Sequence, residues 1–212
     1  MVEYHKNLEL IRNKLSYDID GTVFKINKIQ QRKTLGIRSR SPRWAIAGKF
    51  KAQQVTTRVL NIVASVGRTG AVTPVAQLEP VNVGGVNVTN ATLHNQDEVD
   101  RKDVRIGDKI ILQRAGDVIP EVVKVIIEKR PKKTVPYLLP AECPSCNHLL
   151  VRLKDEVVTR CKNASCPAQI KGRIIHFISK SALDIDGLGE KLVRQLLDKK
   201  TIATIDDVFK LT

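Results

Sequence analysis

All four cysteines of the chain fall in one short stretch, as two closely spaced pairs. Cys143 and Cys146 are separated by two residues, and Cys161 and Cys166 by four. Such gaps let two thiolates from one turn bind the same ion, and two turns complete a tetrahedron. Four soft thiolate ligands select Zn²⁺ among the common cellular ions. Because four protein ligands leave no position for a water molecule, the predicted zinc site is structural.

Two disulfides are the alternative interpretation of the same four cysteines. Disulfides persist in secreted proteins and are rare in the cytosol. The sequence begins without the charged and then apolar segment of a secretory leader, so we expect an intracellular protein. That expectation favours the zinc site.

Two lysines lie in segments whose residues alternate as in a β-strand. Lys25, in the segment 18–27, shares a strand face with apolar residues, and Asp20 falls on the opposite face. Lys49, in the segment 44–50, shares its face with two alanines, whose small side chains leave room for a ligand. A lysine among apolar neighbours either extends to solvent or reaches an anion in a cleft. Residue types alone favour solvent for each lysine.

The chain is strongly basic, with 36 Lys and Arg against 22 Asp and Glu in 212 residues, a net charge of +14. A surplus of this size favours a polyanionic partner, most often nucleic acid. A basic soluble surface and a ribosome-associated protein are the alternatives. The composition is that of a globular protein, and no apolar run approaches membrane-spanning length, so we expect no membrane association.

Several segments of regular structure must position these residues. An apolar stripe predicts an amphipathic helix over residues 3–15, and Asp97 to Asp103 fits a short helix. Five short strands with intervening glycine turns suit a small closed barrel such as an OB-fold, with a sandwich as the alternative. These strands are expected at Leu60 to Val66, Ala71 to Leu78, Val81 to Val88, Ile110 to Gln113 and Glu121 to Ile127.

The predicted barrel contains no Phe, Tyr or Trp between residues 55 and 129. Single-strand binders of this fold stack bases on aromatic side chains, so a barrel without them suits a duplex backbone better. Arg68 and Arg114 each lie beside a glycine turn, where a side chain and backbone N–H groups can approach a phosphate together. The alternative is that both arginines solubilise loops.

After the cysteines, two short helical segments flank a pair of glycines. Helices are expected over Ile174 to Ser179 and around Leu192 to Leu197, with Gly187 and Gly189 between them. This order is typical of a helix-hairpin-helix motif, in which backbone N–H groups at a helix N-terminus bind phosphate without reading sequence. A simple cap and turn is the alternative.

In order along the chain, these segments resemble blocks of the bacterial NAD⁺-dependent DNA ligases. The resemblance covers essentially the whole chain, and the blocks around Arg68 and Arg114 are highly specific to that family. The matching blocks are residues 20–25, 42–50, 66–76, 90–95, 114–120, the four-cysteine ribbon and residues 186–191.

The resemblance implies a multidomain α+β chain built of consecutive units. It implies a partial nucleotidyltransferase fold, an OB-fold β-barrel, a four-cysteine zinc ribbon and a helix-hairpin-helix. The expected boundaries are 1–53 for the end of the nucleotidyltransferase (adenylation) domain, 54–130 for the OB-fold, 131–142 for a proline-marked linker, 143–170 for the zinc finger and 171–212 for the start of the helix-hairpin-helix domain.

The resemblance also implies a reaction, namely nick sealing in duplex DNA through enzyme–AMP, DNA-adenylate and phosphodiester formation. NAD⁺ would be the AMP donor, with Mg²⁺ or Mn²⁺ assisting and a structural Zn²⁺. By match, Lys25 and Lys49 would hold the adenylate phosphate, and the four cysteines would bind zinc. Contacts to nicked double-stranded DNA would come from Arg68, Thr69, Arg114, Gly187 and Gly189. A cytoplasmic, nucleoid-associated monomer is expected.

The chain departs from the family pattern in ways that bear on activity. No Lys-x-Asp-Gly block, which carries the adenylated lysine, occurs in it, so we expect this chain alone to be inactive in self-adenylation. Asp18 stands where Glu is usual, Lys51 where Pro is usual, and Gly48 where an aromatic is usual, which is expected to loosen the pocket wall beside Lys49. A stand-alone zinc-containing DNA-binding clamp without catalysis is the alternative function.

Overall fold

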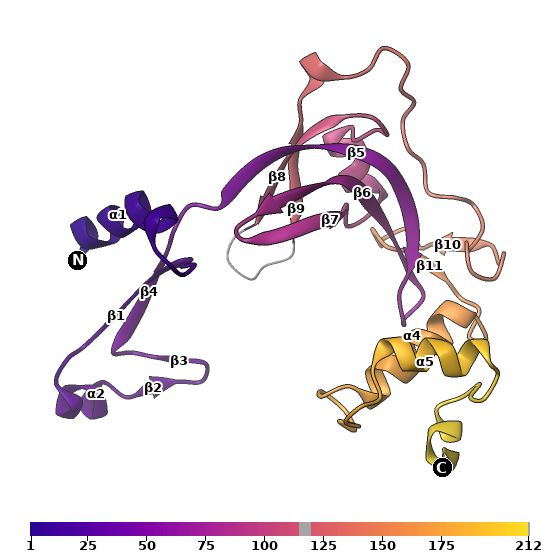
Figure 1. The fold of residues 1–212 in the computed structure, drawn as a ribbon. Coiled ribbons are helices and arrows are strands. Elements are labelled where there is room, and N and C mark those ends of the chain that lie inside the picture. Colours follow the sequence, from indigo (N-terminus) through magenta and orange to yellow (C-terminus); the bar gives the residue numbers. More distant parts are fainter. Residues whose placement is uncertain (115–119, 212) are drawn as a thin grey trace.

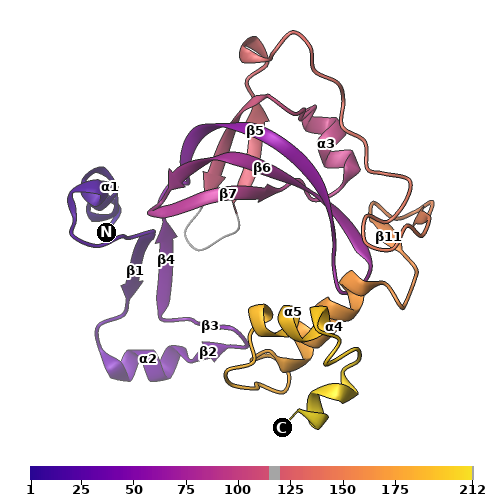
Figure 2. The ribbon, with the colours of Figure 1, turned by 45° about the vertical axis from the view of Figure 1, so that its right-hand side comes forward.

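A β-barrel lies between a small N-terminal part and a cysteine-rich hairpin with the C-terminal helices, as Figure 1 and Figure 2 show. The computed structural model describes residues 1–114 and 120–211. The glycine turn expected at Gly116-Asp117 lies outside the described residues. Within the described part of the chain, no helix is long and apolar enough to cross a membrane.

The N-terminal part consists of a helix and a two-stranded hairpin with a long connection. Its elements are α1 (Val2–Ile11), the 3₁₀ helix η1 (Arg12–Lys14), β1 (Gly21–Lys25), α2 (Ile29–Leu35), β2 (Ile37–Arg38), β3 (Ser41–Pro42) and β4 (Ala45–Lys49). Strands β1 and β4 pair in antiparallel fashion, and β2 pairs with β3 inside the connection. The predicted N-terminal helix and both lysine-bearing strands are confirmed.

Helix α1 packs on one face of the β1–β4 hairpin through a few side chains. His5 Nδ1 lies 2.7 Å from Thr22 Oγ1, and the Tyr4 ring meets Phe24 edge-on at 6.5 Å between centroids. No residue of α1 is buried, and Tyr4 stays 60% exposed. The apolar stripe that the sequence indicates is therefore only partly covered by the described residues.

The barrel is formed by β5 (Gln53–Val66), β6 (Ala71–Val83), β7 (Val86–Thr92), β8 (Lys109–Arg114) and β9 (Glu121–Val125). The strand order β6-β5-β8-β9-β7 closes because β7 also pairs with β6. All pairings within it are antiparallel except the short parallel one between β7 and β9. Helix α3 (Gln96–Lys102) contributes Val99 to a core in which Val59 and Ile110 are fully buried. The predicted closed barrel is confirmed.

Strand β6 is longer than the sequence pattern suggests. The strand expected over 71–78 continues to Val83, so residues 81–83 of the second expected strand belong to β6 and residues 86–88 to β7. The pairing of β6 with β7 changes register between Gln77 and Val81. Gly84 and Gly85 make the tight turn, with φ of 58° and 78°. Positive φ at both central residues matches the twist of antiparallel strands. The two glycines therefore form the turn of the β6–β7 hairpin, inside the segment that was expected to be a single strand.

A buried carboxylate anchors the end of the barrel. Asp108 is 0% exposed; its Oδ1 and Oδ2 accept hydrogen bonds from the Arg130 guanidinium, both at 2.9 Å. The Arg105 backbone N–H donates to Asp108 Oδ2 at 2.9 Å. Asp103 completes this ion-pair cluster by accepting from Arg105 and Arg130.

We expect Asp108→Ala to lower the free energy of unfolding by about 3 kcal/mol, because it leaves the largely buried Arg130 guanidinium with only the partly exposed Asp103 as its ion-pair partner. Thermal unfolding measures this as a drop in Tm of about 10 °C for a chain of this size. Glu128→Ala, which removes an exposed carboxylate near the same end, is the matched control and should leave Tm unchanged. Equal Tm values for the two variants would contradict the anchoring role of Asp108.

The segment 131–142, predicted as a linker, is fastened along the barrel. Gln96 of α3 holds it with both ends of its side-chain amide: Nε2 donates to Tyr137 O at 2.9 Å, and Oε1 accepts from Leu139 N at 2.8 Å. Tyr137 packs against the barrel core, and its burial raises the pKa of the phenol. The 3₁₀ helix η2 (Ile127–Lys129) precedes the segment.

The cysteine-rich hairpin shares a sheet with the barrel. Its strands are β10 (Leu150–Arg152) and β11 (Thr159–Cys161), and β11 pairs with the start of β6. Arg152 adds a second attachment through two hydrogen bonds of 2.8 and 2.7 Å to the Asp97 carboxylate on α3.

The C-terminal part contains α4 (Pro167–Ile178), α5 (Glu190–Asp198) and the 3₁₀ helix η3 (Asp206–Lys210). Its own small core includes Ile174, Val193 and Ile202, all buried. The helix expected from residue 174 begins at Pro167, directly after Cys166. Proline fits this first helical position because its missing N–H would have no partner there.

Candidate functional site

The four cysteines come together as their spacing predicts. Their Sγ atoms all lie within 4.8 Å of one another, with 3.9 Å between Cys143 and Cys166 and 3.6 Å between Cys146 and Cys161. A disulfide needs about 2.05 Å, so the alternative of two disulfides is excluded. A tetrahedral zinc site with Zn–S bonds of about 2.3 Å places its sulfurs about 3.8 Å apart. The cluster fits Zn²⁺.

Local backbone turns aim these thiols at a common centre. In the first pair, Cys143 N donates to His148 O at 2.8 Å and Asn147 N donates to Cys143 O at 2.9 Å. Asn147 has φ of 57°, a left-handed conformation that Asn tolerates better than most residues. In the second pair, Cys166 N donates to Asn163 O at 3.0 Å.

The environment of the cluster also calls for a cation. Cys143, Cys161 and Cys166 are buried, and burial raises the pKa of the Cys161 thiol to about 12 and that of Cys143 above its usual value. The His148 backbone lowers the pKa of Cys146 to about 6. Neighbouring thiolates repel each other in a buried site, and a divalent ion neutralises them when it binds.

The turn between β5 and β6 packs directly against the cysteine cluster. Gly70 O accepts a hydrogen bond from Cys161 N at 2.8 Å, and a Cβ at Gly70 would lie 2.3 Å from Cys161 O. Cys161 O instead accepts from the buried Gln169 of α4, at 2.9 Å from Nε2. Gly70 therefore sits between a cysteine of the cluster and helix α4.

Helix α4 also supports the neighbouring residue of that turn. A Cβ at Gly172 would lie 2.9 Å from Cβ of Arg68, so a glycine is needed for the turn to lie on the helix. The side chains of Arg68 and Thr69 remain exposed. Neither Gln169 nor Gly172 is indicated by sequence reasoning; a glycine in the middle of an amphipathic helix is the one local signal.

Lys25 and Lys49 lie on the same face of the β1–β4 hairpin. The register pairs Gly21 with Lys49 and Lys25 with Ala45, so the lysines stand at opposite ends, about 13 Å apart along the strands. The face between them is open, with Val23 59% exposed.

Asp20, which the strand pattern places on the face opposite Lys25, pairs with the other lysine. It precedes β1, where strand alternation does not apply, and its carboxylate forms an ion pair with Lys49. The hydrogen bond from Lys49 lowers the pKa of the Asp20 carboxyl.

Gly48 faces away from Lys49 and toward α1. A Cβ at Gly48 would lie 3.1 Å from the His5 ring, which itself packs on Phe50 at 4.9 Å between centroids. His5 therefore fills the space beside Gly48. The expected loosening of the wall next to Lys49 is wrong, because consecutive residues of a strand point to opposite faces.

Arg114 lies at the other end of the barrel from Arg68. It pairs in register with Gln53, the first residue of β5, whereas Arg68 comes just after the last residue of β5. The 14 residues of β5 have a length of about 40 Å along the strand, and this length lies between the two arginines. Arg114 Nη1 donates to Gly84 O at 3.4 Å, and Gly84 N donates to Gln53 Oε1 at 2.9 Å. The two arginines do not form one cluster.

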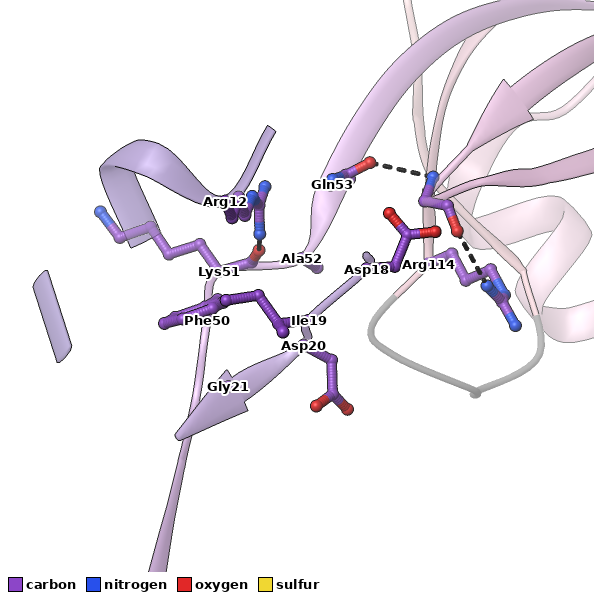
Figure 3. A pocket seen from close by; sticks show the side chains of 11 residues that line it. Arg12, Asp18, Ile19, Asp20, Gly21, Phe50, Lys51, Ala52, Gln53 and Arg114 are labelled. Carbon is purple, nitrogen blue, oxygen red and sulfur yellow. Dashed lines mark hydrogen bonds between the residues drawn. The ribbon is translucent and has the colours of Figure 1, made fainter. Parts of the chain in front are cut away.

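A cavity of about 390 Å³ lies between the N-terminal part and the barrel, near Arg114. Figure 3 shows its lining from both parts: Arg12 lies on the side of the N-terminal helix, whereas Asp18, from the same part of the chain, lies beside Arg114 of the barrel. Its walls carry both charges, with Lys51 and Asp20 also present.

Gly187 and Gly189 precede α5 as predicted. Gly189 is the N-cap residue of α5, and Gly187 has φ of 77°. Apart from its chain neighbours, no described residue comes within 4 Å of a Cβ built at either glycine, and both glycines are exposed. Gly187 N, however, donates to Asp186 Oδ1 at 2.9 Å.

Comparisons with known proteins agree with this arrangement of barrel and cysteine cluster. Family models match residues 1–53 (NAD-dependent DNA ligase adenylation domain), 56–134 (NAD-dependent DNA ligase OB-fold domain) and 142–168 (NAD-dependent DNA ligase C4 zinc finger domain). These domains define a multidomain zinc-finger protein of DNA metabolism. The chain belongs to the NAD-dependent DNA ligase family.

Curated relatives match the chain from end to end. It is 56% identical to a DNA ligase of Desulfosudis oleivorans and 52% identical to one of Bdellovibrio bacteriovorus, over 100% of the chain in both cases. A DNA ligase of Alkalilimnicola ehrlichii is 54% identical over 99% of the chain. The chain spans 31% of the length of each of these relatives.

Proposed function

We propose that this chain forms the part of a DNA-sealing enzyme that grips nicked duplex DNA and holds the adenylate phosphate. The observation that carries the proposal is the pair Lys25 and Lys49 on one open strand face of a chain of this family. Lysine suits the role because its ammonium group is a mobile point charge beside a phosphoryl group. Lys49 would exchange its pairing with Asp20 for the phosphate.

The proposed reaction has three steps. A lysine of the whole enzyme attacks NAD⁺ to take AMP and release nicotinamide mononucleotide. The AMP passes to the 5′-phosphate at the nick, and the 3′-hydroxyl then displaces it to form the phosphodiester. Charge on the transferring phosphate must be neutralised in each step, which Lys25 and Lys49 would provide in the second and third.

Mg²⁺ or Mn²⁺ also belongs to the proposed reaction. Among residues 1–114 and 120–211, however, the four cysteines are the one group of three or more His, Cys, Asp or Glu side chains close enough together to hold an ion. We therefore assign no residue of this chain to the divalent cofactor. Zn²⁺ at the cysteines has a structural role in the proposal.

The DNA contacts of the proposal come from three separate places. Arg68 and Thr69 are exposed in the β5–β6 turn, which lies against the zinc finger. Arg114 lines the cavity between the N-terminal part and the barrel. Gly187 and Gly189 would open the backbone of a helix-hairpin-helix to phosphate. All three contact the backbone of the duplex and read no sequence.

A substrate that already carries AMP tests the proposal directly. We expect the zinc-loaded chain to seal a pre-adenylated nicked duplex slowly with Mg²⁺ and without NAD⁺, because this substrate bypasses the nucleophilic lysine. Lys25→Ala and Lys49→Ala should each reduce sealing about 100-fold or more, as for other groups that neutralise transition-state charge. Lys154→Ala, which removes an exposed lysine of the cysteine-rich hairpin, is the control and should seal normally.

The same preparation distinguishes the alternative function. The chain lacks a Lys-x-Asp-Gly block, and this favours a DNA-binding clamp without catalysis as the second candidate. Tight binding of nicked duplex without any sealing would select the clamp. Covalent attachment of AMP to this chain after incubation with NAD⁺ would contradict both proposals.

A further inference from the structure

The positive charge of the chain is concentrated in one stretch. Residues 21–78 contain eleven Lys and Arg and no Asp or Glu, whereas the whole chain has a net charge of +14. Elsewhere, cations alternate with carboxylates, as in the ion pairs Arg101–Glu98 and Arg160–Glu156. The surplus that suggests a polyanionic partner therefore belongs mainly to this stretch.

Six of these cations lie in the connection between β1 and β4, which we call the basic arm (residues 28–43). Figure 1 and Figure 2 both place α2 of the arm at the end of the β1–β4 hairpin that is remote from the barrel. The hairpin strands are five residues long, about 17 Å, so the arm is well separated from the Arg114 cavity. The six cations are Lys28, Arg32, Lys33, Arg38, Arg40 and Arg43.

One of these cations braces the arm internally. The Arg32 guanidinium lies 4.8 Å from the centre of the Trp44 ring, and its Nε donates to Ile26 O. Two backbone bonds add to the brace, from Ile26 N to Trp44 O at 2.9 Å and from Arg43 N to Gly36 O at 3.2 Å. The arm is thus held in a defined conformation at its base.

The other five cations, Lys28, Lys33, Arg38, Arg40 and Arg43, have no such role. All five are exposed, and their side chains form no hydrogen bond or ion pair with the described residues. Five uncompensated like charges in sixteen residues repel one another and oppose folding. Solubility alone would be served by interspersed charges of both signs, as on the rest of this chain.

We propose that the basic arm binds the phosphodiester backbone of duplex DNA, at a place separate from the barrel and the C-terminal turn. This inference rests on the proposed function for the identity of the polyanion. Duplex is favoured over single strands because residues 28–43 contain no Phe, Tyr or Trp on which bases could stack, and the Trp44 ring at the base of the arm already has the Arg32 guanidinium over one face. Contacts to phosphates from Lys and Arg add affinity and no sequence preference.

The test compares two variants of equal net charge in the whole zinc-loaded chain. The arm variant carries Lys28→Gln, Lys33→Gln, Arg38→Gln and Arg40→Gln, which leaves the Arg32 brace intact. The control variant carries Lys129→Gln, Lys132→Gln, Lys133→Gln and Lys154→Gln, four exposed cations without side-chain partners outside the arm. Affinity for a nicked duplex is measured as a function of salt concentration, without NAD⁺, and Tm is measured for each variant.

The logarithm of the binding constant falls by about 0.9 per logarithmic unit of salt for each phosphate neutralised. If the arm neutralises two or three phosphates, the arm variant should lose about 2–3 units of this slope and bind at least about 100-fold more weakly at 0.1 M salt. Its Tm should not fall, and the control variant should keep the slope of the unaltered chain.

Each other outcome overturns the inference. An unchanged slope in the arm variant excludes phosphate contacts by the arm, and an equal loss in the control variant means that charge acts diffusely. An equal loss of affinity for a single strand of the same length excludes the preference for duplex. Failure of the unaltered chain to bind nicked duplex overturns the proposed function together with the arm.

Discussion

Removal of zinc should unfold the cysteine-rich hairpin and release it from the barrel, while the barrel itself stays folded. The hairpin has two three-residue strands, and its buried cluster consists of three cysteines with few apolar neighbours. Structural zinc sites of this size contribute about 10–16 kcal/mol of apparent binding free energy, far more than so small a core can replace. The barrel has its own core, to which fourteen buried residues among those the structure describes belong.

Hydrogen exchange after chelation measures this effect residue by residue. We expect Cys161 N, which donates to Gly70 O, to exchange rapidly in the chelated chain. Val59 N, which donates to Asp108 O inside the barrel, should keep its protection. Cys161→Ser should reproduce the effect in part, and Ser165→Ala, an exposed change in the same loop, should not. Protection of Cys161 N without zinc would contradict the structural role of the metal.

The cysteine cluster was predictable because its signal is local. Pairs spaced by two and four residues form the two turns whatever the rest of the chain does, and the Sγ atoms converge as expected. The strands of the barrel were predictable for a similar reason, since apolar alternation marks one face of each. The exact extent of β6 was not, because the shift between Gln77 and Val81 interrupts the alternation in the middle of one strand.

The supports of the cluster could not be predicted, since they depend on contacts between distant residues. Gly70 and Gln169 are separated by about a hundred positions, and neither carries a motif that points to the other. Likewise, the separation of Arg68 from Arg114 follows from the length and pairing of β5. The common face of Lys25 and Lys49 required the antiparallel register, which alternation in each strand alone does not fix.

Gly70→Ala should separate the β5–β6 turn from the zinc finger. The new methyl group would lie 2.3 Å from Cys161 O, and φ of 79° at this position already strains any residue with a Cβ. A left-handed non-glycine residue costs about 1–2 kcal/mol, and displacement of Cys161 O from its bond with Gln169 costs about 1–3 kcal/mol more. We therefore expect a loss of about 3 kcal/mol, seen as a Tm lower by about 10 °C.

The same turn offers a matched control three residues earlier. Gly67→Ala would place its methyl group at ordinary contact distance, 3.6 Å from Ala71 O, and φ of Gly67 is not in the left-handed region, so Tm should change little. If the turn presents Arg68 to a phosphate, Gly70→Ala should also weaken binding of nicked duplex more than Gly67→Ala does. Gly172→Ala presses on Arg68 from α4 without touching the zinc finger and should weaken binding in the same direction. Equal Tm values and equal affinities for nicked duplex in Gly70→Ala and Gly67→Ala would mean that the turn does not depend on its contact with Cys161. The zinc site would then not position Arg68 for the proposed DNA contact.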